Sequence, residues 1–297
     1  MSAYADDPHR TGVSVLPDGR RLGWAEWGPP DGTPVLLCPG AGTSRRLNFG
    51  ADVPRDPLRV RLVSVDRPGL GASDPSPGRT LDDWATDVRH LAADRDLPAE
   101  RLRIVGFSQG TPFALCCAAR GLASAVAVVS AGDELAAPGF ADALPPEVRE
   151  LVRLATTDPR RAEESFAAFG SADTLWEVIL AGSGETDRAV YREARFEPLF
   201  RQALAEGFRQ GPAGYARDTL LSMSRWTFDP ARITVPVDIW YGALDTSTVH
   251  SPDQGATLAR RIPTARHHVL PEAGGALLWT HAERILRHLL RSGGPAH

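Results

Sequence analysis

Short apolar segments separated by turn residues dominate the first half of the chain. The segments at residues 12–16 and 21–27 flank the turn signal Pro17-Asp18-Gly19, so they are predicted to form a β-hairpin. The segment at residues 34–38 is a continuous apolar run, which is typical of a strand buried on both faces of a mostly parallel sheet, and three later segments are expected to form similar strands. These buried strands are expected at residues 34–38, 59–66, 102–105 and 125–129.

Helical periodicity appears between these strands. From Thr80 onward the apolar residues follow the i, i+3, i+4, i+7 spacing of an amphipathic helix, and Asp83 completes a pattern that resembles a capping box. A second helix is expected at residues 111–120. Strands that alternate with helices predict an α/β fold with helices on both faces of the sheet.

The strand signal disappears between residues 133 and 229, where amphipathic helical segments follow one another. Their aromatic side chains are expected to be mostly core and together to enclose an apolar pocket. Strands return at 235–241 and 267–270, which makes eight in all, and helices are predicted at 253–261 and 277–290.

This pattern predicts two domains. Residues 1–132 and 230–297 are expected to form the α/β core domain, with its mostly parallel eight-stranded sheet. Residues 133–229 are expected to form a helical cap domain inserted into it. The last residues, 292–297, are expected to be disordered.

Composition narrows the class of protein. The chain has 297 residues and a net charge of -4, and no apolar run approaches the roughly 18 residues of a membrane span. We therefore expect neither a nucleic acid nor a membrane as partner. Three cysteines, two of them adjacent, argue against a disulfide framework, and no signal-peptide pattern is present, so a soluble cytoplasmic protein is predicted. Nothing in the sequence indicates the oligomeric state.

The sequence Gly106-Phe107-Ser108-Gln109-Gly110 lies between a predicted strand and a predicted helix. This is the context of a nucleophile elbow, in which two glycines permit a tight turn and the serine stands at its tip. The alternative is an ordinary glycine-rich loop whose serine caps the helix.

Three further segments resemble motifs of the α/β-hydrolase family, in its capped branch of esterases and proline iminopeptidases. They are Pro39-Gly40-Ala41-Gly42-Thr43-Ser44-Arg45, Asp66-Arg67-Pro68-Gly69-Leu70-Gly71-Ala72-Ser73 and Trp240-Tyr241-Gly242-Ala243-Leu244-Asp245. Their order along the chain matches that of the family.

The resemblance implies a role for each matching residue. Ser108 would be the nucleophile, Asp245 the acid of a catalytic triad, and the backbone N–H groups of Ala41 and Gln109 an oxyanion hole. The alternative for Asp245 is a loop aspartate satisfied by neighbouring N–H groups. Asp66 and Arg67 are expected to hold their turn together.

The triad histidine is missing from its usual place. Gly275 stands at that position in Pro271-Glu272-Ala273-Gly274-Gly275, whether naturally or by a laboratory substitution, and glycine cannot accept a proton. Of the eight histidines, His250 is the best candidate for a relocated base, because it follows Asp245 by five residues at the ligand-binding edge of the sheet. Its alternative is a surface histidine in a turn.

A second candidate pair, Asp133 and Glu134, follows the strand at 125–129 and could supply an acid or base at the same edge. No metal-binding spacing, phosphate loop or dinucleotide fingerprint is present, so neither a cofactor nor a metal is expected.

Three functions fit this pattern. The first is a serine esterase-like hydrolase acting on an ester or acyl bond of a small hydrophobic substrate, with an atypical or missing triad histidine. The second is a non-hydrolytic cyclase or lyase that uses the oxyanion hole to polarise a carbonyl. The third is a small-molecule binding protein that retains the hydrolase pocket.

Overall fold

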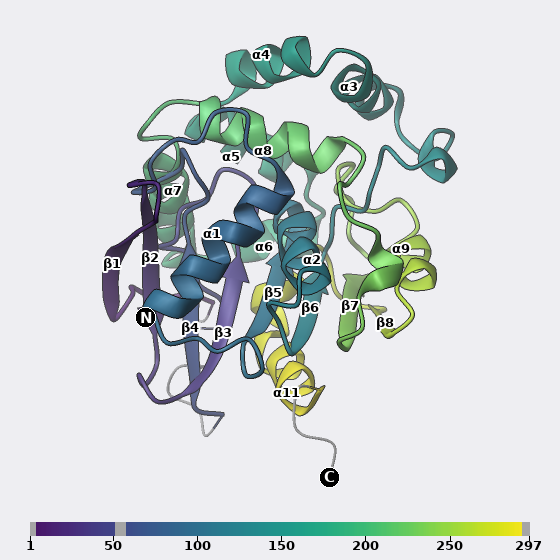
Figure 1. Cartoon of the computed structure of the whole chain (residues 1–297). Coiled ribbons are helices and arrows are strands. Elements are labelled where there is room, and N and C mark those ends of the chain that lie inside the picture. Colours follow the sequence, from purple (N-terminus) through teal and green to yellow (C-terminus); the bar gives the residue numbers. More distant parts are fainter. Residues whose placement is uncertain (1–3, 51–57, 293–297) are drawn as a thin grey trace.

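The computed structural model describes residues 4–50 and 58–292. Of the tail expected to be disordered, residues 293–297 lie outside this description. Within it, eight strands form one sheet in the order β1-β2-β4-β3-β5-β6-β7-β8 (Figure 1). The strands are β1 (Arg10–Val15), β2 (Arg21–Trp27), β3 (Thr33–Cys38), β4 (Val60–Val65), β5 (Arg103–Phe107), β6 (Ala125–Val129), β7 (Val237–Gly242) and β8 (Ala265–Leu270).

The two amino-terminal strands form the predicted hairpin. β1 pairs with β2 in antiparallel orientation, with Val15 opposite Arg21, and β2 pairs antiparallel with β4. The other neighbouring strands are parallel. The prediction of a mostly parallel sheet is confirmed, and the carboxyl ends of its parallel strands meet at one edge.

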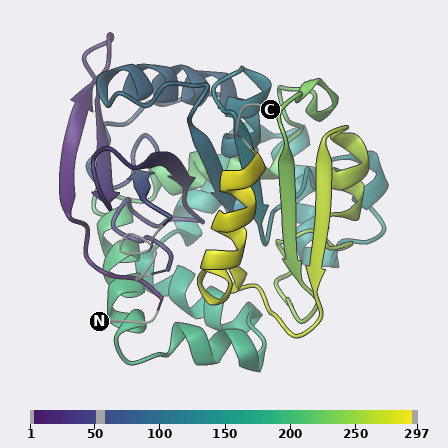
Figure 2. The same ribbon diagram turned by 90° about the horizontal axis from the view of Figure 1, so that it is seen from below.

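Helices cover both faces of the sheet (Figure 2). Each face buries its own apolar cluster. Side chains alternate between the clusters along each strand, so that Leu36 packs on one face and Leu37 on the other. The helices on the first face are α1 (Leu81–Asp94), α2 (Thr111–Ala119) and α9 (Ala256–Arg261). Those on the second face are α10 (Leu277–Thr280) and α11 (Ala282–Ser292).

Six helices between β6 and β7 lie across the carboxyl edge of the sheet (Figure 1), and we call them the inserted helices. They are α3 (Pro146–Thr157), α4 (Pro159–Phe169), α5 (Ala172–Gly182), α6 (Glu185–Tyr191), α7 (Phe196–Gly207) and α8 (Ala213–Met223). Every residue from 133 to 229 is described and none lies in a strand, as the sequence predicts. The division into a core and a cap domain stays a prediction.

Two predicted helices differ from those observed. The helix expected at 253–261 begins only at Ala256, because Gly255 has a φ of +82° and the Asp253 carboxylate instead accepts the Thr257 amide hydrogen at 2.9 Å. The helix expected at 277–290 is two helices, since His281 leaves helical geometry with φ −129° and ψ 24°. The capping box at Thr80 is confirmed.

A buried cluster of charges joins the inserted helices to the core. Asp218 on α8 accepts from Arg67 Nε at 2.6 Å and from the Arg79 guanidinium, and all three side chains are almost completely inaccessible to solvent. Arg67 also donates to the carbonyl oxygens of Pro39 and Gly40, at 2.6 and 3.0 Å. The expectation that Asp66 holds the turn together is confirmed, because its carboxylate accepts the Ala72 amide hydrogen at 2.8 Å. The Arg67 side chain instead bonds to segments outside that turn.

Replacing Asp218 with alanine should strongly destabilise the protein. The substitution leaves the guanidinium groups of Arg67 and Arg79 buried without a carboxylate, which typically costs about 3–5 kcal/mol. The free energy of unfolding in urea measures the loss. A Glu164→Ala variant breaks the exposed pair with Arg160 and serves as the control, for which little change is expected. Equal stabilities of the two variants would contradict a structural role for the cluster.

Candidate active site

Ser108 stands at the tip of a strand-turn-helix element, between β5 and α2. Its φ of +49° is unusual for a residue with a side chain and is typical of the strained turn of a nucleophile elbow. The flanking glycines are required by close packing. A Cβ at Gly110 would lie 2.0 Å from the Cys38 carbonyl oxygen, and one at Gly106 would lie 2.8 Å from the Ala114 Cβ.

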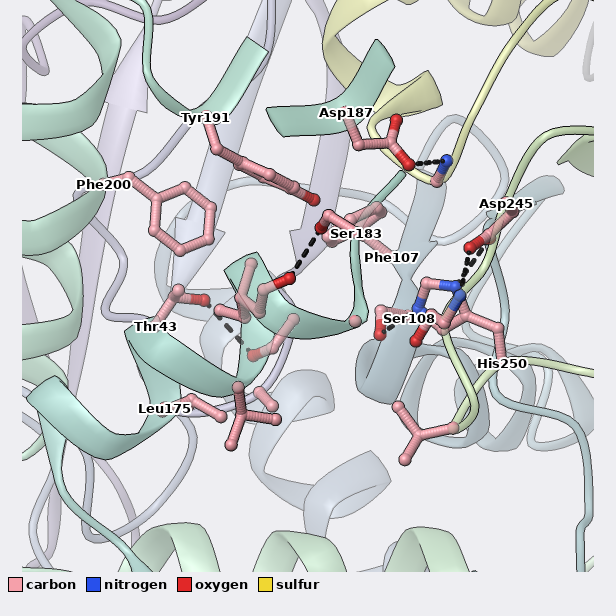
Figure 3. A pocket seen from close by; sticks show the side chains of 18 of the residues that line it. Thr43, Phe107, Ser108, Leu175, Ser183, Asp187, Tyr191, Phe200, Asp245 and His250 are labelled. Carbon is pink, nitrogen blue, oxygen red and sulfur yellow. Dashed lines mark hydrogen bonds and ion pairs between the residues drawn. The ribbon is translucent and has the colours of Figure 1, made fainter. Parts of the chain in front are cut away.

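The imidazole of His250 lies between Ser108 and Asp245 (Figure 3). Its Nε2 is 2.9 Å from Ser108 Oγ, and its Nδ1 is 2.7 Å from Asp245 Oδ2. A carboxylate can only accept, so Nδ1 carries the hydrogen and Nε2 is free to accept the serine proton. The structure thus brings together the three residues singled out in the sequence.

One loop after β7 supplies both the imidazole and the carboxylate. Asp245 Oδ1 accepts the Ser247 amide hydrogen at 3.0 Å, and the His250 amide donates to the Ser247 carbonyl at 3.3 Å. The next residue, Ser251, donates its amide hydrogen to Ala131, directly after β6. These bonds fold the loop back so that His250 faces the turn at Ser108.

Opposing effects set the charge of Asp245. Burial raises the pKa of this carboxyl, but the attraction and hydrogen bond of His250 and the hydrogen bond of the Ser247 amide lower it, and together they prevail. The pKa of Asp245 therefore lies below its ordinary value. A stable carboxylate at this point can accept the Nδ1 hydrogen of His250.

The sequence predicts an oxyanion hole from the backbone amides of Gln109, which follows Ser108 directly, and Ala41, which lines the cavity beside it. Among the hydrogen bonds of residues 4–50 and 58–292, neither amide is a donor to another backbone or side-chain group, so both are available to an anion. The side chain of Gln109 donates to Thr219 Oγ1 at 3.0 Å and is occupied elsewhere. The assignment of these two amides to an oxyanion hole stays a prediction.

Gly275, at the expected histidine position, lies between two carboxylates. Its amide donates to Asp187 Oδ2 at 2.7 Å, and a Cβ built on it would lie 2.8 Å from Asp245 Oδ1. A Cβ on Gly274 would lie 2.2 Å from Asp187 Oδ1. An imidazole at position 275 would not fit between Asp245 and Ser108, because His250 already lies there.

The pair Asp133 and Glu134 is buried, and its carboxylates bond to groups other than Ser108 and His250. Glu134 accepts from the Trp226 amide at 2.9 Å and from two arginine side chains. Asp133 accepts from the Glu134 amide at 2.6 Å, and burial raises its pKa to about 6. Neither residue lines the cavity beside the serine, so the hypothesis that they supply an acid or base there is wrong.

The cavity beside Ser108 has a volume of about 120 Å³ and lies between the sheet edge and α5, α6 and α7 (Figure 3). Its walls are mainly apolar, as the sequence predicts. They include Leu47, Phe107, Leu175, Val178, Ile179, Tyr191, Phe200, Val249 and Trp279. Asp187 also lines the cavity. No sequence motif marks this residue, and its spacing of four residues from Tyr191 on one helix is the only local signal for it.

One group of side chains in the described part of the chain could hold a metal ion. Asp238, His268 and His288 bring their ligand atoms within 4.8 Å of one another. Asp238 stands near the beginning of β7, whereas Asp245 follows the end of that strand, and Asp238 already pairs with Arg266 at 2.6 Å. This group is separate from the cavity.

The model of the alpha/beta hydrolase fold family matches residues 33–282. An esterase from Rhodococcus sp. resembles the structure with a TM-score of 0.64 at 22% identity, covering 96% of this chain and 99% of that one. An enol-lactonase from Burkholderia xenovorans gives 0.64 at 19% identity, covering 94% and 98%. A Synechocystis relative, provisionally named a non-heme chloroperoxidase, is 25% identical over 76% of this chain and 78% of its own length. In the described residues, no helix is both long and apolar enough to cross a membrane.

The raised pKa of Asp133 predicts a pH-dependent stability. The folded state favours the protonated form of this carboxyl. Its contribution to the free energy of unfolding is therefore complete below the ordinary pKa of an aspartic acid and is lost as the pH rises towards 6. An Asp133→Asn variant should therefore gain stability relative to the wild type between about pH 4 and pH 6, by up to roughly 3 kcal/mol.

Urea unfolding at a series of pH values measures this difference. The Asp245→Asn variant is the matched control, because the pKa of Asp245 is lowered instead of raised. As the pH rises, this variant should lose stability relative to the wild type, whereas Asp133→Asn should gain it. A difference between wild type and Asp133→Asn that does not vary with pH would contradict the raised pKa.

Proposed function

Because this chain belongs to the alpha/beta hydrolase fold family, we propose that it is a serine hydrolase that cleaves esters of short acyl groups. The observation that carries the proposal is the unbroken row from Ser108 through His250 to Asp245, with contacts of 2.9 and 2.7 Å. A serine hydroxyl becomes a strong nucleophile when an oriented base can accept its proton. The proposal places that base at His250 and leaves Gly275 outside the chemistry.

The first half of the reaction forms an acyl-enzyme. Ser108 Oγ attacks the carbonyl carbon of the ester, and its proton moves to His250 Nε2. Asp245 stabilises the imidazolium through the Nδ1 hydrogen bond. The carbonyl oxygen becomes an oxyanion, which the amides of Ala41 and Gln109 stabilise. The tetrahedral intermediate collapses when His250 returns the proton to the departing alcohol oxygen.

The second half repeats these steps with water as the nucleophile. His250 accepts a proton from water, which attacks the acyl carbon, and the acid is released as the proton returns to Ser108 Oγ. The apolar walls of the cavity favour an acyl group without charge. The comparatively small cavity volume favours a short one, since ligand pockets for drug-sized molecules measure roughly 300–1,000 Å³.

Two alternatives remain distinct from this proposal. A cyclase or lyase would use the two amides to polarise a carbonyl but would form no covalent bond to Ser108. A binding protein would use the cavity alone. Labelling by a fluorophosphonate, which reacts with an activated serine, separates both alternatives from a serine hydrolase.

The Ser108→Ala and His250→Ala variants should each lose nearly all activity on a short-chain aryl ester. Loss of either residue in a known serine hydrolase, subtilisin, reduces kcat about 10⁶-fold, and a comparable loss is expected here. Initial rates of ester hydrolysis and the extent of fluorophosphonate labelling provide the two measurements. His267→Ala removes an exposed histidine on β8 and is the matched control, with no change expected. Unchanged turnover in His250→Ala would rule out His250 as the base.

A side chain at position 275 should lower activity rather than raise it. The Cβ of Gly275→His would lie 2.8 Å from Asp245 Oδ1, so the carboxylate must move away from its contact with His250. Misplacing a catalytic group by about 1 Å can reduce the rate about 10²-fold. The kcat of Gly275→His and Gly275→Ala should fall together, because the Cβ alone causes the displacement. A gain in Gly275→His would instead show that Asp245 accepts a second imidazole.

A further inference from the structure

Two polar side chains on the wall of the cavity belong to neither the triad nor the oxyanion hole. Asp187 and Tyr191 lie four residues apart on α6, so they project from one face of this helix. Their exposed fractions are only 3% and 6%, yet both line the cavity beside Ser108 (Figure 3). Buried polar groups normally have hydrogen-bond partners, so their remaining bonding capacity needs an explanation.

Asp187 has unused acceptor capacity. Its two carboxylate oxygens accept the amide hydrogens of Gly275 and Ala276, at 2.7 and 2.9 Å, which fixes the orientation of the group. A carboxylate offers about four lone-pair sites, so about two remain. Burial raises the pKa of Asp187, while the two amides oppose this effect. A further donor from the cavity would stabilise the buried charge.

Tyr191 has an unpartnered hydroxyl. Among the hydrogen bonds of the described residues none involves this group, and burial raises the pKa of the phenol, so it keeps its proton. The ring is held by Phe196, Phe200 and Trp279, at centroid distances of 6.5, 5.5 and 5.9 Å. The hydroxyl is therefore held in place with both its hydrogen and its oxygen lone pairs available to a ligand.

A hydroxyl group on the ligand matches this pair. It can donate its hydrogen to Asp187 and accept the Tyr191 hydrogen on its oxygen. An ammonium group has donors only and would leave the Tyr191 hydrogen without an acceptor, and a methyl group would satisfy neither side chain. The cavity volume of about 120 Å³ is close to that of an engineered cavity of ~150 Å³ that binds benzene, so it fits an acyl group of about six heavy atoms.

We infer that Asp187 and Tyr191 form a hydroxyl-binding subsite, which makes this chain selective for esters of short hydroxy acids. The inference rests on the proposed function, because it places the acyl group of the ester in the cavity beside Ser108. Asp187 has a second effect, since its bonds to Gly275 and Ala276 fix the loop next to Asp245. The specificity test therefore centres on Tyr191, which makes no such bond.

The test compares substrates of equal size. Ethyl 2-hydroxybutanoate and ethyl 3-hydroxybutanoate are measured against the corresponding 2-methyl and 3-methyl esters, with acid release followed in a pH-stat. In the wild type, kcat/KM for one hydroxy ester should exceed that of its methyl partner at least about tenfold, since a hydrogen bond to a charged group is among the stronger ones. Tyr191→Phe should reduce this ratio several-fold, while the ring contacts are retained.

Ser183→Ala is the matched control. Ser183 also lines the cavity, but its hydroxyl hydrogen is donated to the Ile179 carbonyl at 2.6 Å. Its loss should leave the hydroxy-to-methyl ratio unchanged. A ratio near one in the wild type, or a ratio that falls in Ser183→Ala and not in Tyr191→Phe, would overturn the assignment. A stronger preference for ethyl 3-aminobutanoate that Asp187→Asn abolishes would identify a cation subsite instead.

A binding measurement separates this inference from the proposed hydrolysis. Calorimetric titration of the wild type with 2- and 3-hydroxybutanamide should show binding of one amide that is several-fold weaker in Tyr191→Phe, and the matching methylbutanamide should bind more weakly. If the hydroxyl-dependent binding is observed but no ester is hydrolysed in a Ser108-dependent manner, the hydroxyl-binding subsite is supported and the proposed hydrolase function is contradicted. If esters are hydrolysed but neither the amides nor the esters show a hydroxyl preference, only the subsite falls.

Discussion

One buried guanidinium holds together the segments that surround the nucleophile. Arg67 donates to the carbonyls of Pro39 and Gly40, pairs with Asp218 on α8, and lies 4.7 Å from the centre of the Phe113 ring on α2. A buried guanidinium is costly unless its N–H groups find hydrogen-bond acceptors, so the groups that accept from Arg67 are held in fixed positions relative to one another. The loop before Ala41, the helix after Ser108 and α8 are therefore joined in one frame by this side chain.

Within that frame, the loop after β7 supplies the imidazole that contacts Ser108, because the space at Gly275 is filled by other groups. The position where the family usually carries its histidine lies between the carboxylates of Asp187 and Asp245, and only glycine fits there. His250, five residues after Asp245, reaches Ser108 from the opposite end of the same loop. Asp187, one of these two carboxylates, also lines the cavity. The approach of α6 thus both fills the space at Gly275 and supplies part of the polar wall of the cavity.

The cavity itself combines rigid aromatic walls with a few fixed polar groups. Tyr191 is held by its ring contacts, and Asp187 is held by two backbone amides, so neither loses much freedom when a ligand binds. Preorganised donors and acceptors of this kind discriminate between ligands better than apolar surface does. The proposed specificity therefore depends on an inserted helix, whereas the proposed chemistry depends on the loops at the edge of the sheet.

The sequence by itself determined the eight-stranded sheet and the elbow at Ser108, because apolar periodicity and glycine spacing act over a few neighbouring residues. It also indicated Asp245 and His250 as neighbours on one loop. Only the tertiary structure decided that the imidazole faces the serine, that Asp133 and Glu134 do not, and that Asp187 fills the space beside Gly275. Those outcomes depend on which distant segments meet, and local patterns carry little information about contacts across 88 positions of the chain.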